Sequence, residues 1–248
     1  HYANWHNPLV GRALVEILHH HRVDVYVPLN QSPTWMTKIA MGDIERVRKL
    51  SASTLRLLAE SVRQGYEIVT TEPSATLFLK HEYLNLVDDE DSRLVAKHTW
   101  DAGRYLWSMH QSNELELDFQ PLTMSTIYHL PCHLRAIDTD QPGRNLMRLI
   151  PGLQVLDAEA GCSGMAGTYG LRLENYRTSL RIGWPLISKM QSTASQFGTT
   201  ECTSCKLQME QGTDKPTVHP IALLAFAYGK LPEVRLWLER RNEGLTVL

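Results

Sequence analysis

Residues 161–170 read GCSGMAGTYG, and this stretch, with the cysteines on either side of it, is the most informative part of the chain. Four of its ten residues are glycine, so the backbone can adopt positive φ values and approach a bulky group closely. The loop contains no GxGxxG run, which excludes a dinucleotide fingerprint here. A flexible turn before a helix is the alternative, but it leaves Cys162 unexplained.

All four cysteines of the chain lie between positions 132 and 205. Four cysteines in 248 residues are too few for a small disulfide scaffold. In a reducing compartment, such a local group more often indicates metal binding or catalysis. Cys202 and Cys205 form a CxxC pair at the start of an expected helix, where backbone N–H groups lower the pKa of a thiol.

Composition limits the other possible functions. The chain has 43% hydrophobic residues, enough for one large domain or two smaller ones. A net charge of -2 gives no electrostatic reason to bind nucleic acid or an anionic membrane. The longest apolar run, residues 221–228, is far shorter than the roughly 20 residues of a membrane span. No signal peptide is visible and the chain begins at His1, so we expect a fragment or processed product, cytoplasmic, with any membrane link made through a partner.

Hydrophobic periodicity predicts strands that alternate with helices. Strands are expected at 23–27, 66–70, 123–128, 153–157 and 196–200. Helices are expected at 8–18, 43–65, 76–83, 92–110, 143–149, 171–191, 203–211, 219–228 and 233–241. This alternation predicts an α/β fold of βαβ units with open parallel sheets and helices on their faces.

An internal echo indicates two repeats of one α/β unit. Thr70-Thr71-Glu72 follows one expected strand, and Thr199-Thr200-Glu201 follows another. Residues 111–122 are polar and contain Pro121, so they are the expected boundary. We therefore expect a first, cysteine-free repeat at 1–115 and a second repeat with the four cysteines at 116–248.

The expected topology would gather the thiols. Cys132, Cys162 and Cys202 each follow an expected strand, and the carboxyl ends of parallel strands meet at one edge of a sheet. Iron–sulfur clusters and zinc both accept four thiolates. Structural zinc sites usually use two close pairs, whereas this chain has one CxxC and two isolated thiols. A redox CxxC alone would leave Cys132 and Cys162 without a role.

Three segments carry a resemblance to a known family. HLPCH, GCSGMAGTYGLRLENYRTS and ECTSCKLQME, followed by His219-Pro220, resemble the cysteine-rich CCG domain. That domain occurs in the iron–sulfur subunits of anaerobic glycerol-3-phosphate dehydrogenase and glycolate oxidase, in heterodisulfide reductase, and in FAD-linked oxidases. The resemblance continues more weakly through NWHNPLVGRALVEIL and EYLNL in the first half. Proteins of this family usually carry two such repeats, in agreement with the echo.

The resemblance implies a ligand set. Its metal ligands would be Cys132, Cys162, Cys202 and Cys205, with Gly164, Gly167, Ser163 and His133 beside the cofactor. His129 also flanks the first cysteine, and both histidines could tune the metal centre or serve the structure.

The chain departs from the family pattern in two places. The family's Cys-Cys-Gly is Cys162-Ser163-Gly164 here, so a hydroxyl replaces one thiol. Five-cysteine versions are associated with a noncubane cluster, and four thiolates match a cubane [4Fe–4S] cluster, which is the expectation. The corresponding positions of the first repeat are Pro33-Thr34-Trp35 and Pro73-Ser74-Ala75, so that repeat is expected to be metal-free scaffold or docking surface.

The function that the resemblance implies is electron transfer. A flavin (FAD) on a partner domain or subunit would oxidise a 2-hydroxy acid or glycerol 3-phosphate, and the cluster would relay electrons toward a quinone or another carrier. The chain alone is not expected to turn over substrate. Two alternatives are a heterodisulfide-type thiol/disulfide reductase, against which Ser163 counts, and a zinc-stabilised interaction domain.

Other titratable residues point to no second site. His19-His20-His21 is not expected to bind one metal ion, because consecutive helical residues point about 100° apart. No nucleophile–base pair or carboxylate dyad stands out by its spacing, so no catalytic residue is predicted.

Overall fold

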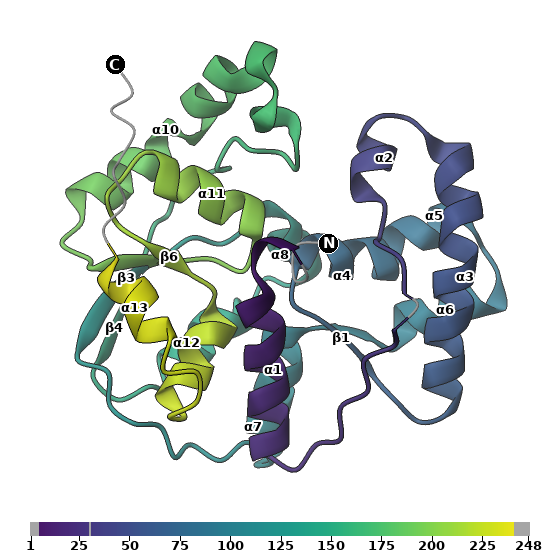
Figure 1. The fold of residues 1–248 in the computed structure, drawn as a ribbon, viewed down its shortest axis with the longest axis horizontal. Coiled ribbons are helices and arrows are strands. Elements are labelled where there is room, and N and C mark those ends of the chain that lie inside the picture. Colours follow the sequence, from purple (N-terminus) through teal and green to yellow (C-terminus); the bar gives the residue numbers. More distant parts are fainter. Residues whose placement is uncertain (1–4, 30, 241–248) are drawn as a thin grey trace.

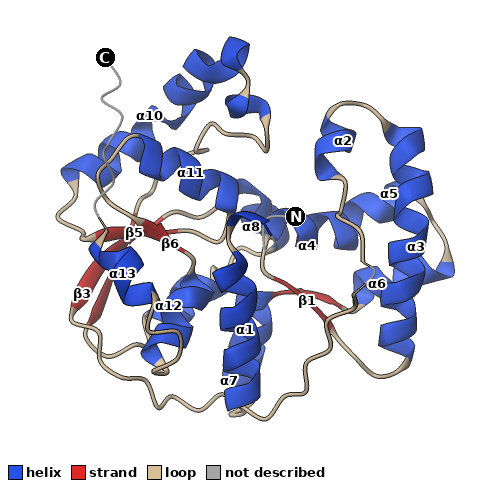
Figure 2. Cartoon of the chain, viewed as in Figure 1, coloured by secondary structure: helices blue, strands red, loops and turns tan. Residues whose placement is uncertain are grey.

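The computed structural model describes residues 5–29 and 31–240. It contains a four-stranded and a two-stranded sheet, both parallel, and helices surround both sheets (Figures 1 and 2). The expected α/β class with open parallel sheets is therefore confirmed.

The larger sheet, in the second half of the chain, has the strand order β4-β3-β5-β6 with every neighbouring pair parallel. Its strands are β3 (Met124–Tyr128), β4 (Leu153–Asp157), β5 (Phe197–Thr199) and β6 (Thr217–Val218). In the register, Thr126 lies opposite both Val155 and Phe197. Because all four strands run in one direction, the loops after them lie along a single edge.

Helices cover both faces of this sheet (Figure 1). Successive side chains of a strand point to opposite faces, so Tyr128 enters one apolar core with α12, and Ile127 enters another with α10 and α11. The helices of this half are α8 (Cys132–Ile137), α9 (Pro142–Met147), α10 (Tyr176–Ser192), α11 (Thr203–Gln211), α12 (Pro220–Ala227) and α13 (Val234–Glu239), with 3₁₀ turns η3 (Tyr169–Leu171) and η4 (Leu173–Asn175).

The smaller sheet pairs β1 (Ile68–Thr70) with β2 (Thr99–Asp101). A separate apolar core beside it includes Val47, Leu55, Phe78 and Val95. The helices around it are α2 (Met36–Ala40), α3 (Ile44–Arg63), α4 (Pro73–Leu77), the π-helical turn η2 (Phe78–Glu82), α5 (Tyr83–Leu86) and α6 (Glu90–Lys97).

Two helices of the first half pack against the second half. In α1 (Pro8–His20) and α7 (Ala102–Gln111), the buried side chains Ile17 and Leu106 belong to the same core as Leu224 of α12. Packing therefore crosses the sequence boundary at 115/116. The two-repeat division stays a proposal about the sequence.

Two predicted elements are wrong. Residues 23–27 form no strand: Val23 and Val25 pack against the larger core, while Tyr26 and Val27 are exposed and no neighbouring strand pairs with them within the described residues. The predicted helix 92–110 is two helices separated by β2. The apolar periodicity continues on both sides of β2, and only pairing with β1 distinguishes these three residues as a strand.

Other differences concern bounds and short elements. The predicted helix 171–191 begins at Tyr176 after the two 3₁₀ turns, and Pro185 lies inside it. The predicted helix 76–83 is divided among α4, η2 and α5. The elements α2, α8 and β6 were not predicted, because six residues or fewer show little periodicity. The helix at 203–211 is confirmed as α11.

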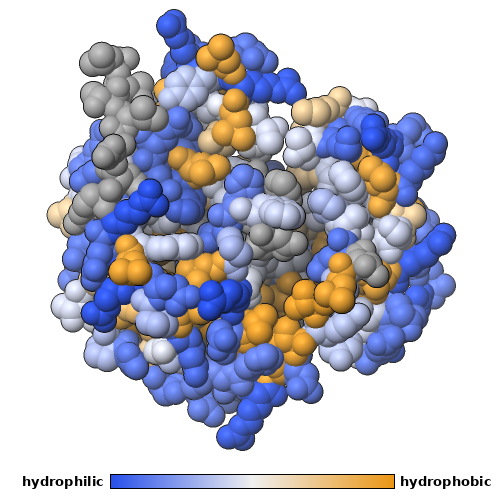
Figure 3. Space-filling model, viewed as in Figure 1, coloured by the Kyte–Doolittle hydropathy of each residue, from blue (hydrophilic) through white to orange (hydrophobic). Residues whose placement is uncertain are grey.

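The surface in Figure 3 is largely hydrophilic, with apolar side chains in separate groups. Among the described residues, none of the helices combines the length and the apolar character needed to cross a bilayer.

Candidate metal centre

The four cysteines lie on loops and helix starts that follow the strands of the larger sheet. Cys132 is the first residue of α8, directly after β3, and Cys162 lies in the loop after β4. Cys202 caps α11 after β5, and Cys205 lies in the first turn of that helix. Cys132 and Cys162 are exposed, Cys202 is half-buried and Cys205 is buried. The four thiols thus line one edge, from surface to interior.

The sulfur atoms interact in two pairs. A hydrogen bond between Cys132 and Cys162 raises the pKa of Cys132 and lowers the pKa of Cys162 to about 6. The backbone N–H of Gly164 also donates to the Cys162 sulfur at 3.3 Å. In the second pair, a hydrogen bond from Cys205 lowers the pKa of Cys202 to about 7, with help from backbone N–H groups at the start of α11.

Charge interactions and one hydrogen bond link the two pairs. The charge of Cys202 also raises the pKa of Cys132, and the charge of Cys132 raises the pKa of Cys205. Ser163, which follows Cys162 in the chain, donates a hydrogen bond from Oγ to the Cys205 sulfur at 3.2 Å. The structure therefore brings together all four thiols that the sequence singles out, from three separate loops.

The spacing of these thiols can be compared with that around a metal ion. A tetrahedral zinc ion with Zn–S bonds of about 2.3 Å would hold its sulfur atoms about 3.8 Å apart. In the part of the chain that the structure describes, no three of these sulfur atoms lie within 4.8 Å of one another. In this metal-free arrangement the four thiols form two pairs. This donor set fits a larger group held by four thiolates, such as an iron–sulfur cluster.

The glycines of the 161–170 loop serve its packing against α10. Gly164 has φ +87°, and a Cβ atom there would lie 2.0 Å from the carbonyl oxygen of Ser179. The Ser179 hydroxyl donates to the carbonyl oxygen of Gly164 at 2.9 Å. From the other side, a Cβ on Gly183 would lie 2.1 Å from the carbonyl oxygen of Ser163. Gly167, at φ +65°, has open space where its Cβ would be.

Ser163 and the two histidines differ in their relation to the thiols. Ser163 is 1% exposed and contacts sulfur directly. The His133 backbone N–H lowers the pKa of Cys132, while burial lowers the pKa of its own half-buried imidazole. Within the described residues, the His133 ring makes no hydrogen bond to a sulfur atom. His129 is buried, which lowers its pKa to about 4, and its Nε2 atom has no hydrogen-bond partner.

The first half of the chain contacts the start of the CxxC helix. Glu72, just after β1, accepts hydrogen bonds from the Thr203 backbone N–H at 3.2 Å and from the Thr203 hydroxyl. Burial, followed by the charge of Cys202, raises the pKa of Glu72 to about 8. His219 accepts from the Ile221 N–H through Nδ1 and donates from Nε2 to the Thr71 carbonyl at 3.0 Å. Both contacts join β1 to the edge that carries the thiols.

A second buried carboxyl group, that of Glu201, ends the other of the two Thr-Thr-Glu segments. Glu201, at the position equivalent to Glu72, is fully buried, and burial raises its pKa well above the usual value. The Tyr128 hydroxyl donates to Glu201 at 3.0 Å. From the sequence, the two Thr-Thr-Glu segments were interpreted only as a sign of duplication. That Glu72 and Glu201 each follow a strand was the feature of the sequence that could have placed both glutamates near the thiols.

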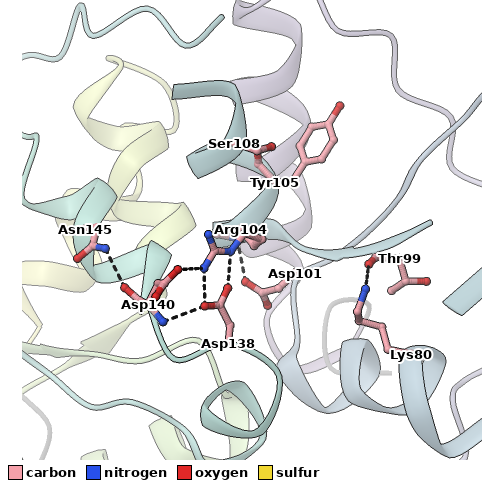
Figure 4. Close-up of polar contacts among 10 residues, drawn as sticks. Lys80, Thr99, Asp101, Arg104, Tyr105, Ser108, Asp138, Asp140 and Asn145 are labelled. Atoms are coloured by element: carbon pink, nitrogen blue, oxygen red, sulfur yellow. Dashed lines mark hydrogen bonds and ion pairs between the residues drawn. The ribbon is translucent and has the colours of Figure 1, made fainter. Parts of the chain in front are cut away.

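An ion-pair network holds α8, which begins at Cys132, against α7 (Figure 4). Arg104 of α7 donates to both carboxylate oxygens of Asp138 at 2.5 Å, and to Asp140 at 2.9 Å. These hydrogen bonds raise the pKa of Arg104. Asn145 donates to the Asp140 carbonyl at 2.8 Å, so the same loop is also tied to α9. The first half thus helps to position Cys132.

The cysteine-free segments of the first repeat are placed differently from each other. Pro73 begins α4, which packs against α8 near Cys132. Trp35 caps α2 with φ 59° and packs against the smaller core.

Of the histidine run at 19–21, His20 pairs with Asp118 at 3.0 Å, and the His21 ring forms a hydrogen bond with the Ile17 carbonyl.

Comparison with known proteins shows similarity to one kind of domain over part of the chain. Residues 126–210 match the model of the CCG cysteine-rich domain. The chain is 30% identical over 227 residues to one subunit of the anaerobic glycerol-3-phosphate dehydrogenase of Escherichia coli, a match that covers 91% of this chain and 57% of that protein.

Two further relatives are more distant. One subunit of the fumarate reductase (CoM/CoB) of Methanothermobacter marburgensis is 25% identical, over 86% of this chain and 41% of that protein. An iron–sulfur protein of Methanocaldococcus jannaschii is 27% identical, over 64% of this chain and 29% of that protein. The chain spans little more than half the length of its Escherichia coli relative. Over residues 126–210, this chain is therefore similar to the CCG cysteine-rich domain.

Proposed function

We propose that this chain is the iron–sulfur electron-transfer module of a flavin-linked dehydrogenase. The observation that carries the proposal is the convergence of four thiols from three loops on one edge of a parallel sheet. Similarity to a dehydrogenase subunit and to an iron–sulfur protein supports it. Because the chain spans only part of that subunit, the activity of the whole complex belongs to the proposal.

In this proposal Cys132, Cys162, Cys202 and Cys205 hold a [4Fe–4S] cluster, which supplies one-electron oxidation and reduction when bound. Cys162 and Cys202, with pKa values of about 6 and 7, provide thiolates at neutral pH. Cys132 and Cys205 release their protons when they become ligands. The exposed pair, Cys132 and Cys162, lies where an electron can enter or leave.

The cubane form is favoured by the contact that Ser163 makes. The noncubane cluster is associated with five-cysteine versions of the domain that this chain resembles, and it would need a fifth thiol at this position. Here the side chain is a hydroxyl that donates to Cys205 at 3.2 Å. Ser163 therefore acts as a hydrogen-bond donor to a ligand sulfur, and four thiolates complete the set.

The partner in this proposal is a flavoprotein. FAD on another domain or subunit oxidises a 2-hydroxy acid or glycerol 3-phosphate, and electrons pass through this chain toward a quinone or another carrier. Any association with the inner membrane is made through a partner. Residues 1–115, which contain no cysteine, act as scaffold by holding α8 and α11 through Arg104 and Glu72.

Metal analysis of the anaerobically purified chain tests this function. We expect about four iron and four acid-labile sulfide per chain, and an EPR signal after reduction. Cys132→Ala and Cys205→Ala should each lose iron, whereas Ser163→Ala, which keeps all four thiols, should retain it. Zinc without iron or sulfide contradicts the proposal. Substrate oxidation with a dye acceptor by this chain alone contradicts the assignment of the flavin to a partner.

A further inference from the structure

Residues 169–184, which we call the arm, expose an unusual number of large apolar side chains. The arm consists of η3, η4 and the start of α10, and it projects from the rest of the molecule at the top of Figure 1. Figure 3 shows apolar side chains on this projection. Of the fifteen exposed large apolar residues in the described part of the chain, five lie in the arm: Tyr169, Leu171, Leu173, Ile182 and Trp184.

The packing of the arm explains why these side chains remain in solvent. The loop contacts α10 through its backbone, because a Cβ on Gly164 would lie 2.0 Å from the Ser179 carbonyl oxygen and a Cβ on Gly170 would lie 2.3 Å from Ser179 Oγ. This close contact leaves no room for large side chains, and Leu171 and Leu173 are 62% and 90% exposed. An exposed apolar group with polar residues around it is typical of an interaction surface.

The charge of this region is opposite in sign to that of the whole chain. Residues 160–192 contain four basic residues and one acidic residue, whereas the chain has a net charge of -2. Arg172, Arg177 and Arg181 are exposed, and none of the three forms an ion pair within the described residues. These positive charges are therefore available to a partner that carries carboxylates on its surface.

The arm is continuous with the metal centre. Residues 161–168 lead directly from the Cys162 loop into η3, and the Gly164 N–H donates to the Cys162 sulfur at 3.3 Å. Cys132 and Cys162 are the two exposed thiols. Arg135, exposed on α8, adds a further positive charge close enough to lower the pKa of Cys162. A protein bound to the arm would therefore lie beside the exposed thiols.

The arrangement of residue types favours a protein partner over a membrane surface. A helix that lies on a membrane separates its charged face from its apolar face. In the arm the two kinds alternate, because Arg172 lies between Leu171 and Leu173, and Arg181 lies three residues before Trp184 on the same side of α10. Arginine, tyrosine and tryptophan are also the residue types that are enriched at protein interfaces.

We propose that the arm, together with Arg135, is the docking surface for an acidic face of the flavoprotein that exchanges electrons with this chain. This assignment rests on the proposed electron-transfer function. Leu171 and Leu173 make the central apolar contacts, and Arg172, Arg177 and Arg181 pair with carboxylates of the partner around them. Such charge pairs orient the partner and speed its association.

Anaerobic co-purification at low ionic strength tests the surface. The tagged full chain is expressed in the cells from which it comes, and FAD and iron per chain are measured after purification. We expect a protein that contains FAD, identified by mass spectrometry, to purify with the chain. Its release should increase with salt concentration, because salt screens the attraction between opposite charges at the rim.

Two variants of the arm locate the contact. Leu173→Asp places a charge among the apolar side chains, and the double variant Arg177→Glu/Arg181→Glu reverses the charge of the rim. Each should lower the co-purified FAD about tenfold or more and leave the iron content unchanged.

Two matched controls lie outside the arm. Leu236→Asp changes a side chain of α13 that is 69% exposed, and Arg56→Glu reverses an exposed charge of α3. Both controls should retain FAD to within about twofold of the unaltered chain.

The proposal is overturned if the arm variants retain as much FAD as the unaltered chain, or if the iron-loaded chain purifies without a flavoprotein. Binding to phosphatidylglycerol vesicles that Leu173→Asp abolishes would also overturn it and would assign the arm to a membrane surface. An unaltered chain without iron would contradict the electron-transfer function itself, so the two failures are distinguishable. All substituted positions are exposed, and unfolding curves check that each variant is folded.

Discussion

At the level of single side chains, Ser163 is the residue whose chemistry is most distinctive. Its buried hydroxyl donates to the Cys205 sulfur, in the place where the family pattern has a thiol. Hydrogen bonds to ligand sulfur stabilise the more negatively charged, reduced form of a cluster and so raise its reduction potential. Ser163→Ala should therefore lower the midpoint potential in an EPR-monitored redox titration. Ser163→Thr keeps the hydroxyl and should leave the potential closer to that of the unaltered protein; equal potentials in all three proteins would contradict this role.

At the level of secondary-structure elements, the 161–170 loop is held on α10 by close backbone contact. Gly164→Ala would place Cβ 2.0 Å from the Ser179 carbonyl oxygen and would also strain a residue at φ +87°. We expect a loss of about 2–4 kcal/mol in the free energy of unfolding, measured by urea denaturation. Gly167→Ala is the matched control in the same loop, since its φ is +65° but its Cβ would meet nothing within 4 Å. That variant should lose only about 1 kcal/mol, and equal losses in the two variants would argue against the packing explanation.

Across the whole molecule, Glu72 joins the first half to the CxxC helix of the second. Burial raises its pKa from 4.5 to about 8, so the folded state holds this proton more tightly than the unfolded state. The stability that Glu72 contributes is therefore full below pH 4.5 and is lost as the pH rises through about 8. Glu72→Gln keeps acceptor and shape without titrating. Its free energy of unfolding should fall less between pH 5 and pH 8.5 than that of the unaltered metal-free protein, in urea titrations at several pH values.

The matched control for this pH dependence is Glu239→Gln, because Glu239 is exposed at the end of α13. Its stability should follow that of the unaltered protein at every pH. Parallel curves for Glu72→Gln and the unaltered protein would show that Glu72 does not titrate with folding.

Local patterns were sufficient for much of this molecule. The sequence predicts a helix at 203–211 that the structure has with the same bounds, and Asn7-Pro8 marks the start of α1. Strand and helix signals depend on neighbouring residues, so β3, β4 and β5 could be located from the sequence. Parallel strands share a carboxyl edge, so the meeting of Cys132, Cys162 and Cys202 could be anticipated as well.

Contacts between distant segments needed the folded chain. Thr99–Asp101 is a strand only because β1 lies beside it, and residues 23–27 form no strand because no neighbour pairs with them in the described structure. Glu72 reaches Thr203 across 131 residues, and Arg104 reaches Asp138 across 34. Periodicity records which side of an element is apolar, whereas these contacts depend on where folding places each element against the others.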